Sequence, residues 1–70
     1  MHRVRVSSTV LAAVGYDETT RTLEIRFHSG SLYRYRDVPP DVVLELLQSD
    51  SLGHYFTTAV RDTYAVERLR

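Results

Sequence analysis

The segment of residues 23–39, LEIRFHSGSLYRYRDVP, limits most strongly what this chain can fold into. Apolar and polar side chains alternate in residues 23–27 and again in residues 32–36, which is the pattern of half-buried β-strands. The polar residues 28–31 between them include a glycine and predict a tight turn. The segment is therefore predicted to form a β-hairpin that leads into a helix whose first turn holds Pro39.

The pairing of these two strands decides where the two tyrosine rings point, because a shift of one residue turns every side chain to the other face. A three-residue loop of residues 29–31 pairs Tyr33 with Phe27 and places Tyr33 and Tyr35 on the core face. A two-residue loop exposes both rings and buries Arg34. The first register is favoured because burying an unpaired guanidinium costs several kcal/mol.

The rest of the chain completes a small α+β domain. Alternation over residues 10–16 predicts a first strand, and Ser7-Ser8 before it predicts that residues 1–8 form a loose N-terminal arm. Helical spacing after Pro39 and after Ser51 predicts two helices. The predicted architecture is a single domain over residues 1–70, a three-stranded antiparallel β-meander followed by two α-helices packed on one face. A short extended piece is expected at the tail.

Composition excludes several classes of protein. The 70 residues contain no cysteine, so disulfides and thiolate chemistry are excluded, and no apolar run approaches the roughly 20 residues that cross a bilayer. We expect a cytoplasmic protein. The net charge of zero argues against binding nucleic acid by bulk charge, but residues 1–36 carry six Arg and three acidic residues while residues 37–70 carry three Arg and six.

Few residues are arranged for catalysis. The three histidines lack metal-ligand spacing, and no serine follows a nucleophile motif, so we expect no enzyme activity, no metal and no cofactor. The sequence Ser49-Asp50-Ser51-Leu52-Gly53 is either an ordinary helix cap, with Gly53 allowing the two helices to approach, or a weak anion site.

The uncovered face of the sheet is the remaining candidate site. In the favoured register Arg26, His28, Arg34 and Arg36 gather there with only Glu24 for local compensation. Planar cations on an open face suit RNA phosphates and bases, and Arg61 is a further candidate contact. The alternative is a solvated polar face with no ligand.

Several of these residues together resemble the KTSC domain, a short module at the C-terminus of some lysyl-tRNA synthetases that also occurs as separate small bacterial proteins. The resemblance is carried by Ser7-Ser8, Gly15-Tyr16, Leu23-x-Ile25-x-Phe27, Gly30, Tyr33-x-Tyr35, Val38-Pro39, Ser51-x-Gly53-x-x-Phe56, Arg61 and Tyr64. It implies structural roles for Tyr33, Tyr35, Pro39, Ser51, Gly53, Phe56 and Tyr64. The family has no established activity, and its attachment to a synthetase suggests RNA binding.

Two functions therefore remain open. One is a non-enzymatic module that binds RNA, such as tRNA, through the basic face of the sheet. The other is a module for protein interaction or self-association, which uses an unpaired sheet edge and the charge asymmetry between the two halves of the chain.

Overall fold

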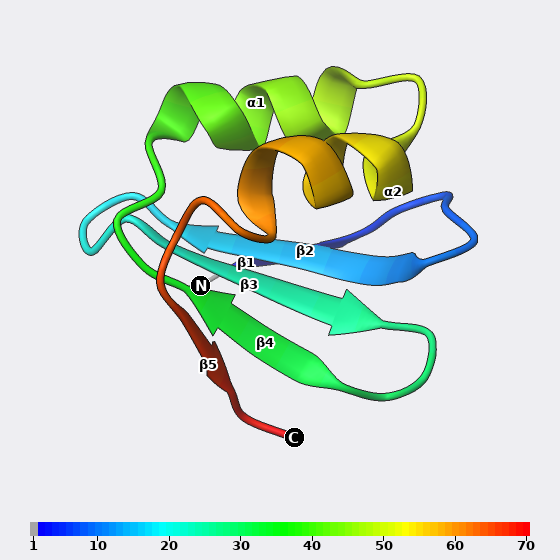
Figure 1. Cartoon of the computed structure of the whole chain (residues 1–70), viewed down its shortest axis with the longest axis horizontal. Coiled ribbons are helices and arrows are strands. Elements are labelled where there is room, and N and C mark those ends of the chain that lie inside the picture. The colour runs from blue at the N-terminus through cyan, green and yellow to red at the C-terminus, as the bar shows by residue number, and fades with distance from the viewer. Residues whose placement is uncertain (1) are drawn as a thin grey trace.

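The computed structural model describes the backbone of residues 2–70 and the side chains of residues 4–70. The chain forms one antiparallel sheet with its helices on a single face (Figure 1). The strands are β1 (His2–Arg5), β2 (Leu11–Asp17), β3 (Thr22–Phe27), β4 (Leu32–Tyr35) and β5 (Val66–Arg68), and they lie in that order across the sheet. The helical segments are α1 (Pro40–Gln48), α2 (Leu52–Tyr55) and the π-helical turn η1 (Phe56–Val60).

The predicted fold class is confirmed, but the predicted number of strands is wrong. The sheet has five strands, because β1 is added at one edge and β5 at the other. Residues 1–8 were expected to be a loose arm, yet β1 pairs with β2, with Val4 opposite Val14. The break at Ser7-Ser8 is a turn within the sheet, where the Ser8 hydroxyl accepts hydrogen bonds from the backbone N–H groups of Val10 and Leu11.

The β3–β4 hairpin keeps the predicted facing of the tyrosines in a different register. Tyr33 lies opposite Ile25 rather than Phe27, a shift of two residues that leaves both rings on the core face. The loop is therefore residues 28–30, closed by a hydrogen bond of 2.9 Å from the Phe27 N–H to the Ser31 carbonyl. Gly30 has a φ of 98°, and this requirement fixes the glycine at the last loop position.

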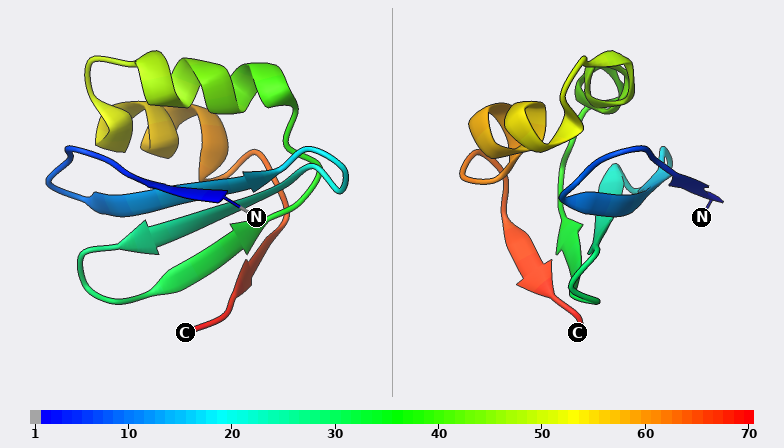
Figure 2. Two further views of the ribbon diagram at one scale, coloured as in Figure 1. Left: turned by 180° about the vertical axis from the view of Figure 1, so that it is seen from behind. Right: turned by 90° about the vertical axis from the view of Figure 1, so that its right-hand side faces the viewer.

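The core lies between the sheet and the helices. Its buried members are Leu11, Val14, Leu23, Ile25, Tyr35, Val38, Val43, Leu46, Phe56 and Val60. Burying a side chain of this size contributes about 1.5–3 kcal/mol, so the core accounts for most of the favourable folding energy. The edge view in Figure 2 shows that both helices lie on one side of the sheet and leave the opposite face, here called the outer face, uncovered.

Helix α1 begins one residue later than predicted. Pro40 is its first residue and Pro39 is the N-cap, in extended conformation, because the residue before a proline avoids helical geometry. On α1, Val43 and Leu46 are buried against the sheet, whereas Leu47 is 40% exposed. No helix among residues 2–70 is long and apolar enough to span a bilayer.

Candidate nucleic-acid interface

The outer face carries a row of charged side chains in the middle of the sheet. Glu24 on β3 pairs with Arg34 on β4, and Arg34 in turn pairs with Glu67 on β5, so the three side chains lie side by side. The Arg34 guanidinium donates to one Glu24 oxygen from Nη2 at 2.9 Å and from Nε at 3.3 Å. Glu24 is only 5% exposed while Arg34 is 36% exposed, so the carboxylate of this ion pair is desolvated, and the pair already neutralises Arg34.

Arg36 also has an acidic partner. Its Nη2 lies 3.0 Å from a Glu67 carboxylate oxygen, with both side chains about half exposed. The expectation that Glu24 alone compensates the basic face is therefore wrong. Glu67 was missed because a three-residue edge strand at the tail has too short an alternating pattern to predict pairing with β4.

A cationic hollow, lined by Arg5, Val6, Ala12, Ala13, Arg26 and His28, lies on the β1 side of the outer face. Arg5 on β1 and Arg26 on β3 both pair with Ala13, so they flank its small side chain on the same face. The hollow has a volume of about 310 Å³, and none of its lining residues is acidic. Neither arginine forms an ion pair with any residue whose side chain the structure describes.

Two local features shape this hollow. A bulge in β2 between Leu11 and Ala13 shifts the register there, and bulges commonly bend a strand beside a functional site. The His28 ring is fixed by a hydrogen bond of 2.8 Å between Nε2 and the Ser8 carbonyl. Since a carbonyl only accepts, Nε2 carries the hydrogen. The outer face thus retains two uncompensated arginines, Arg5 and Arg26, of which the sequence predicted only Arg26.

Arg61 lies on the other face of the sheet. It lines an aromatic cleft of about 410 Å³ together with Phe27, Tyr33, Tyr35 and Phe56. The Arg61 side chain is exposed, but it lies on the helix side of the sheet and therefore cannot assist the residues of the outer face. The η1 turn before it is π-helical, with a hydrogen bond of 2.9 Å from the Arg61 N–H to the Phe56 carbonyl.

The five predicted contact residues therefore do not form one surface. Arg26, Arg34 and Arg36 lie on the outer face, and His28 lies at its rim in the hairpin turn. Arg61 is separated from them by the sheet. Of the four on the outer side, two are already paired with carboxylates, so Arg26 and His28 are the best placed for a ligand.

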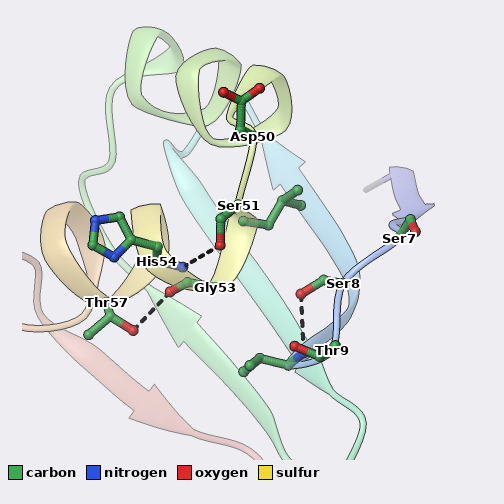
Figure 3. Close-up of a pocket in the computed structure, with 10 residues that line it drawn as sticks. Ser7, Ser8, Thr9, Asp50, Ser51, Gly53, His54 and Thr57 are labelled. Carbon is green, nitrogen blue, oxygen red and sulfur yellow. Dashed lines mark hydrogen bonds between the residues drawn. The ribbon is translucent and has the colours of Figure 1, made fainter.

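A third hollow, rich in hydroxyl groups, lies where residues 7–10 meet residues 50–57 (Figure 3). The Ser51 hydroxyl accepts a hydrogen bond of 3.3 Å from the His54 N–H, which is the predicted helix cap. The Thr57 hydroxyl donates to the Gly53 carbonyl at 2.9 Å. Gly53 approaches Val10 rather than α1, since an added Cβ would lie 3.3 Å from a Val10 methyl group.

This hydroxyl-rich hollow contains Asp, His and Ser side chains without a catalytic arrangement. In Figure 3 the Asp50 carboxylate is directed away from Ser51, and the His54 ring lies on the far side of α2 from Ser8. A nucleophile needs a base within hydrogen-bond reach and a group that orients the base. Within residues 4–70 no group of three His, Asp or Glu side chains is placed to hold a metal ion.

The residues that carry the resemblance to the KTSC domain lie in the aromatic cleft, in the hydroxyl-rich hollow and beside the core. Tyr33, Tyr35 and Phe56 line the aromatic cleft, while Ser51 and Gly53 line the hydroxyl-rich hollow. Pro39 caps α1 and the half-buried Tyr64 packs against the core.

Comparison with known proteins identifies relatives of two sizes. An uncharacterized protein of Stutzerimonas stutzeri is 52% identical over 56 residues, which cover 80% of this chain and 79% of that protein. A lysine–tRNA ligase of Nostoc punctiforme is 33% identical over 66 residues, which cover 94% of this chain but 12% of the ligase. The chain thus spans a small part of the ligases it resembles.

The fold itself is also known. The crystal structure of a KTSC domain protein from Yersinia pestis matches with a TM-score of 0.95 and 28% sequence identity, over 99% of this chain and 97% of that one. The sequence profile of the KTSC domain matches residues 7–64. The chain therefore belongs to the KTSC domain family.

Proposed function

We propose that this domain is a non-enzymatic module that binds RNA, with phosphate groups held in the cationic hollow of the outer face. The observation that carries the proposal is the position of Arg5 and Arg26 on either side of Ala13, without a carboxylate among the lining residues. Guanidinium groups donate paired hydrogen bonds to phosphate oxygens. His28 adds a third polar group at the rim of the hollow.

The ligase relatives support an RNA rather than another polyanion. Three of the similar proteins are lysine–tRNA ligases, and proteins of that name act on tRNA. A small basic surface attached to such an enzyme adds affinity for the RNA backbone without taking part in the reaction. This support is by association with the relatives, and the contact residues come from the geometry of this chain.

The outer face is suited to the backbone of RNA rather than to its bases. All seven aromatic side chains, five Tyr and two Phe, belong to the core or pack against it from the other face or its edge. Phosphate contacts fix position and give salt-dependent affinity but carry little sequence information. We therefore expect weak, salt-sensitive binding by this face with little preference for sequence.

Titration of labelled tRNA and of single-stranded RNA at two salt concentrations tests the proposal. We expect dissociation constants of about 1–100 μM at low salt. For Arg26→Gln, the slope of log affinity against log salt should decrease by an amount equal to about one phosphate contact. Arg21→Gln is the matched control, because Arg21 has the same charge but lies in the turn at the opposite end of the β3 strand. Absence of salt-sensitive binding, or equal effects of the two variants, would overturn the proposal.

Self-association is the second candidate function. It is favoured by the two edge strands, where Val4 on β1 is 53% exposed and Val66 on β5 is 49% exposed. An edge strand with an exposed apolar side chain is a template for pairing with another chain. Sedimentation over a range of concentrations should show a dimer if an edge is used in this way, and a strict monomer would exclude it.

A further inference from the structure

The aromatic cleft has no part in the phosphate contacts of the outer face. We propose that it binds one unpaired nucleotide, with the base against the Phe27 and Tyr33 rings and the phosphate on Arg61. The inference relies on the proposed function only for RNA as the source of that nucleotide. The cleft volume of about 410 Å³ is within the range of small-ligand sites.

The walls of the cleft are rings that meet edge to face. The Phe27 ring lies 5.4 Å from Tyr33 at an interplanar angle of 84° and 5.5 Å from Phe56 at 71°. Phe27 and Tyr33 are only half-buried, and the Arg68 guanidinium lies over the Tyr33 ring, 5.8 Å from its centroid, so the surface left for a base is mainly that of Phe27 and the part of Tyr33 that Arg68 does not cover. A planar base stacks against such a surface whatever its identity, and stacking of this kind contributes about 1–3 kcal/mol per base.

Polar groups are present at the same cleft. Ser29 and Ser31 line it from the hairpin turn, and their hydroxyls are of the kind that hydrogen-bond to base edges. The combination of an apolar wall with a few convergent polar groups is typical of a site for a small planar ligand.

Arg61 gives the cleft a positive charge. Its side chain is exposed and forms no ion pair with any side chain among residues 4–70. The pKa of Tyr35 is raised, mainly by burial and further by Tyr33. The positive charge of Arg61 lowers it, and the negative charge of Asp62 raises it. The cleft thus has a cation with no carboxylate paired to it among residues 4–70.

The hairpin turn connects this cleft to the cationic hollow. His28 lines the hollow while Ser29 and Ser31 line the cleft, so adjacent residues of one turn reach both faces of the sheet. An RNA strand that crosses the turn contacts both sites. Since a paired base is not free to enter a cleft, the arrangement selects single-stranded over double-stranded RNA.

The cleft is tested with free nucleotides, independently of the outer face. Adenosine and uridine 5′-monophosphate are titrated against the labelled full chain by NMR, with the nucleosides and inorganic phosphate as comparisons. We expect shifts at Ser29, Ser31, Thr57 and the Tyr33 ring, with affinity in about the millimolar range. Arg61→Gln should weaken the monophosphates about tenfold and leave the nucleosides unchanged, since it removes a charged hydrogen-bond donor from an exposed position.

Variants separate this inference from the proposed function. Arg26→Gln is the matched control and should weaken RNA binding without affecting the mononucleotides. Thr57 also lines the cleft and is exposed, so Thr57→Leu should block the mononucleotides. RNA binding without any mononucleotide shifts in the cleft overturns the inference and leaves the proposed function standing. Mononucleotide shifts in the cleft without RNA binding support the inference and overturn the proposed function. Shifts caused by a peptide with an aromatic C-terminal residue, and none by nucleotides, would assign the cleft to a protein ligand and overturn the inference.

Discussion

The Tyr55 hydroxyl on α2 donates a hydrogen bond of 2.7 Å to the Glu45 carboxylate on α1. The bond connects the two helices at a distance of ten residues along the chain. The hydrogen bond to the Glu45 carboxylate raises the pKa of Tyr55 to about 12, and burial and the negative charge of Glu45 contribute to the same shift. The contact between the helices therefore depends on a proton that alkaline solution removes.

The stability of the domain should fall in alkaline solution for this reason. The folded-state pKa of about 12 lies above the ordinary value of 10.0, so the contribution is complete below pH 10 and is lost as the pH rises through the folded value. In Tyr55→Phe the free energy of unfolding should change less between about pH 10 and 12 than in the wild type. Denaturant unfolding across this window measures it. The control is Tyr33→Phe, which removes a hydroxyl that forms no hydrogen bond with residues 4–70 and does not contribute to the raised pKa of Tyr55.

Two arginines on the outer face should differ in their effect on stability. Arg34→Met removes two hydrogen bonds to a carboxylate that is 5% exposed, so the variant should lose about 1.5–3 kcal/mol of unfolding free energy. Arg36→Met removes an ion pair whose side chains are 57% and 49% exposed, and it should lose less than about 1 kcal/mol. Urea midpoints of the two variants give the comparison. Equal losses would show that the Glu24 pair is no more desolvated than the surface pair.

Tyr16 should matter to the connection between the hairpin and α1. Its hydroxyl donates to the carbonyl of Val38, a residue with no exposed surface just before the helix, and burial is the main cause of its raised pKa. Tyr16→Phe leaves that buried carbonyl with one partner fewer and should cost about 1–3 kcal/mol. Thermal unfolding monitored by circular dichroism measures the loss. An unchanged midpoint would mean that water replaces the hydroxyl.

The hairpin turn should tolerate little change at Gly30. Its φ of 98° is unfavourable for any residue with a Cβ, although an added Cβ would meet no atom within 4 Å. Gly30→Ala should therefore cost about 1–2 kcal/mol through backbone conformation alone. Ser29→Ala in the same loop is the control and should change the unfolding free energy by less than about 0.5 kcal/mol.

The sequence was sufficient to predict which face of the sheet carries Tyr33 and Tyr35, but it was not sufficient to predict which strands form the two edges of the sheet. Alternation determines which side of a strand a residue is on, and a register error of two residues preserves it, so Tyr33 and Tyr35 were placed correctly. The edge strand β1 was missed because Ser7-Ser8 indicates a break equally well for a turn or for a loose arm. Whether residues 2–5 form a strand or a loose arm depends on their pairing with β2, and a local sequence pattern does not contain that pairing.

The candidate site was predictable only in part for a related reason. Arg26 follows from strand alternation, but the neutralisation of Arg36 depends on a distant tail strand. The place of Arg61 beside the aromatic cleft depends on how η1 packs against β3 and β4, which no local pattern contains. RNA binding and the roles of the five predicted contact residues stay predictions.

The order of the strands has a consequence for the kinetics of the domain. Neighbouring strands from β1 to β4 are joined by short turns, whereas β5 reaches β4 only after residues 36–65 have been arranged between them. Closing this long segment has the largest loop-closure entropy of any strand pairing in the sheet, so β5 should pair with β4 last during folding. Its residues are all exposed, and its amide hydrogens should exchange with solvent well before those of β3 in the centre. The carboxyl-terminal edge is therefore where this domain is expected to open first, while the hairpin remains closed.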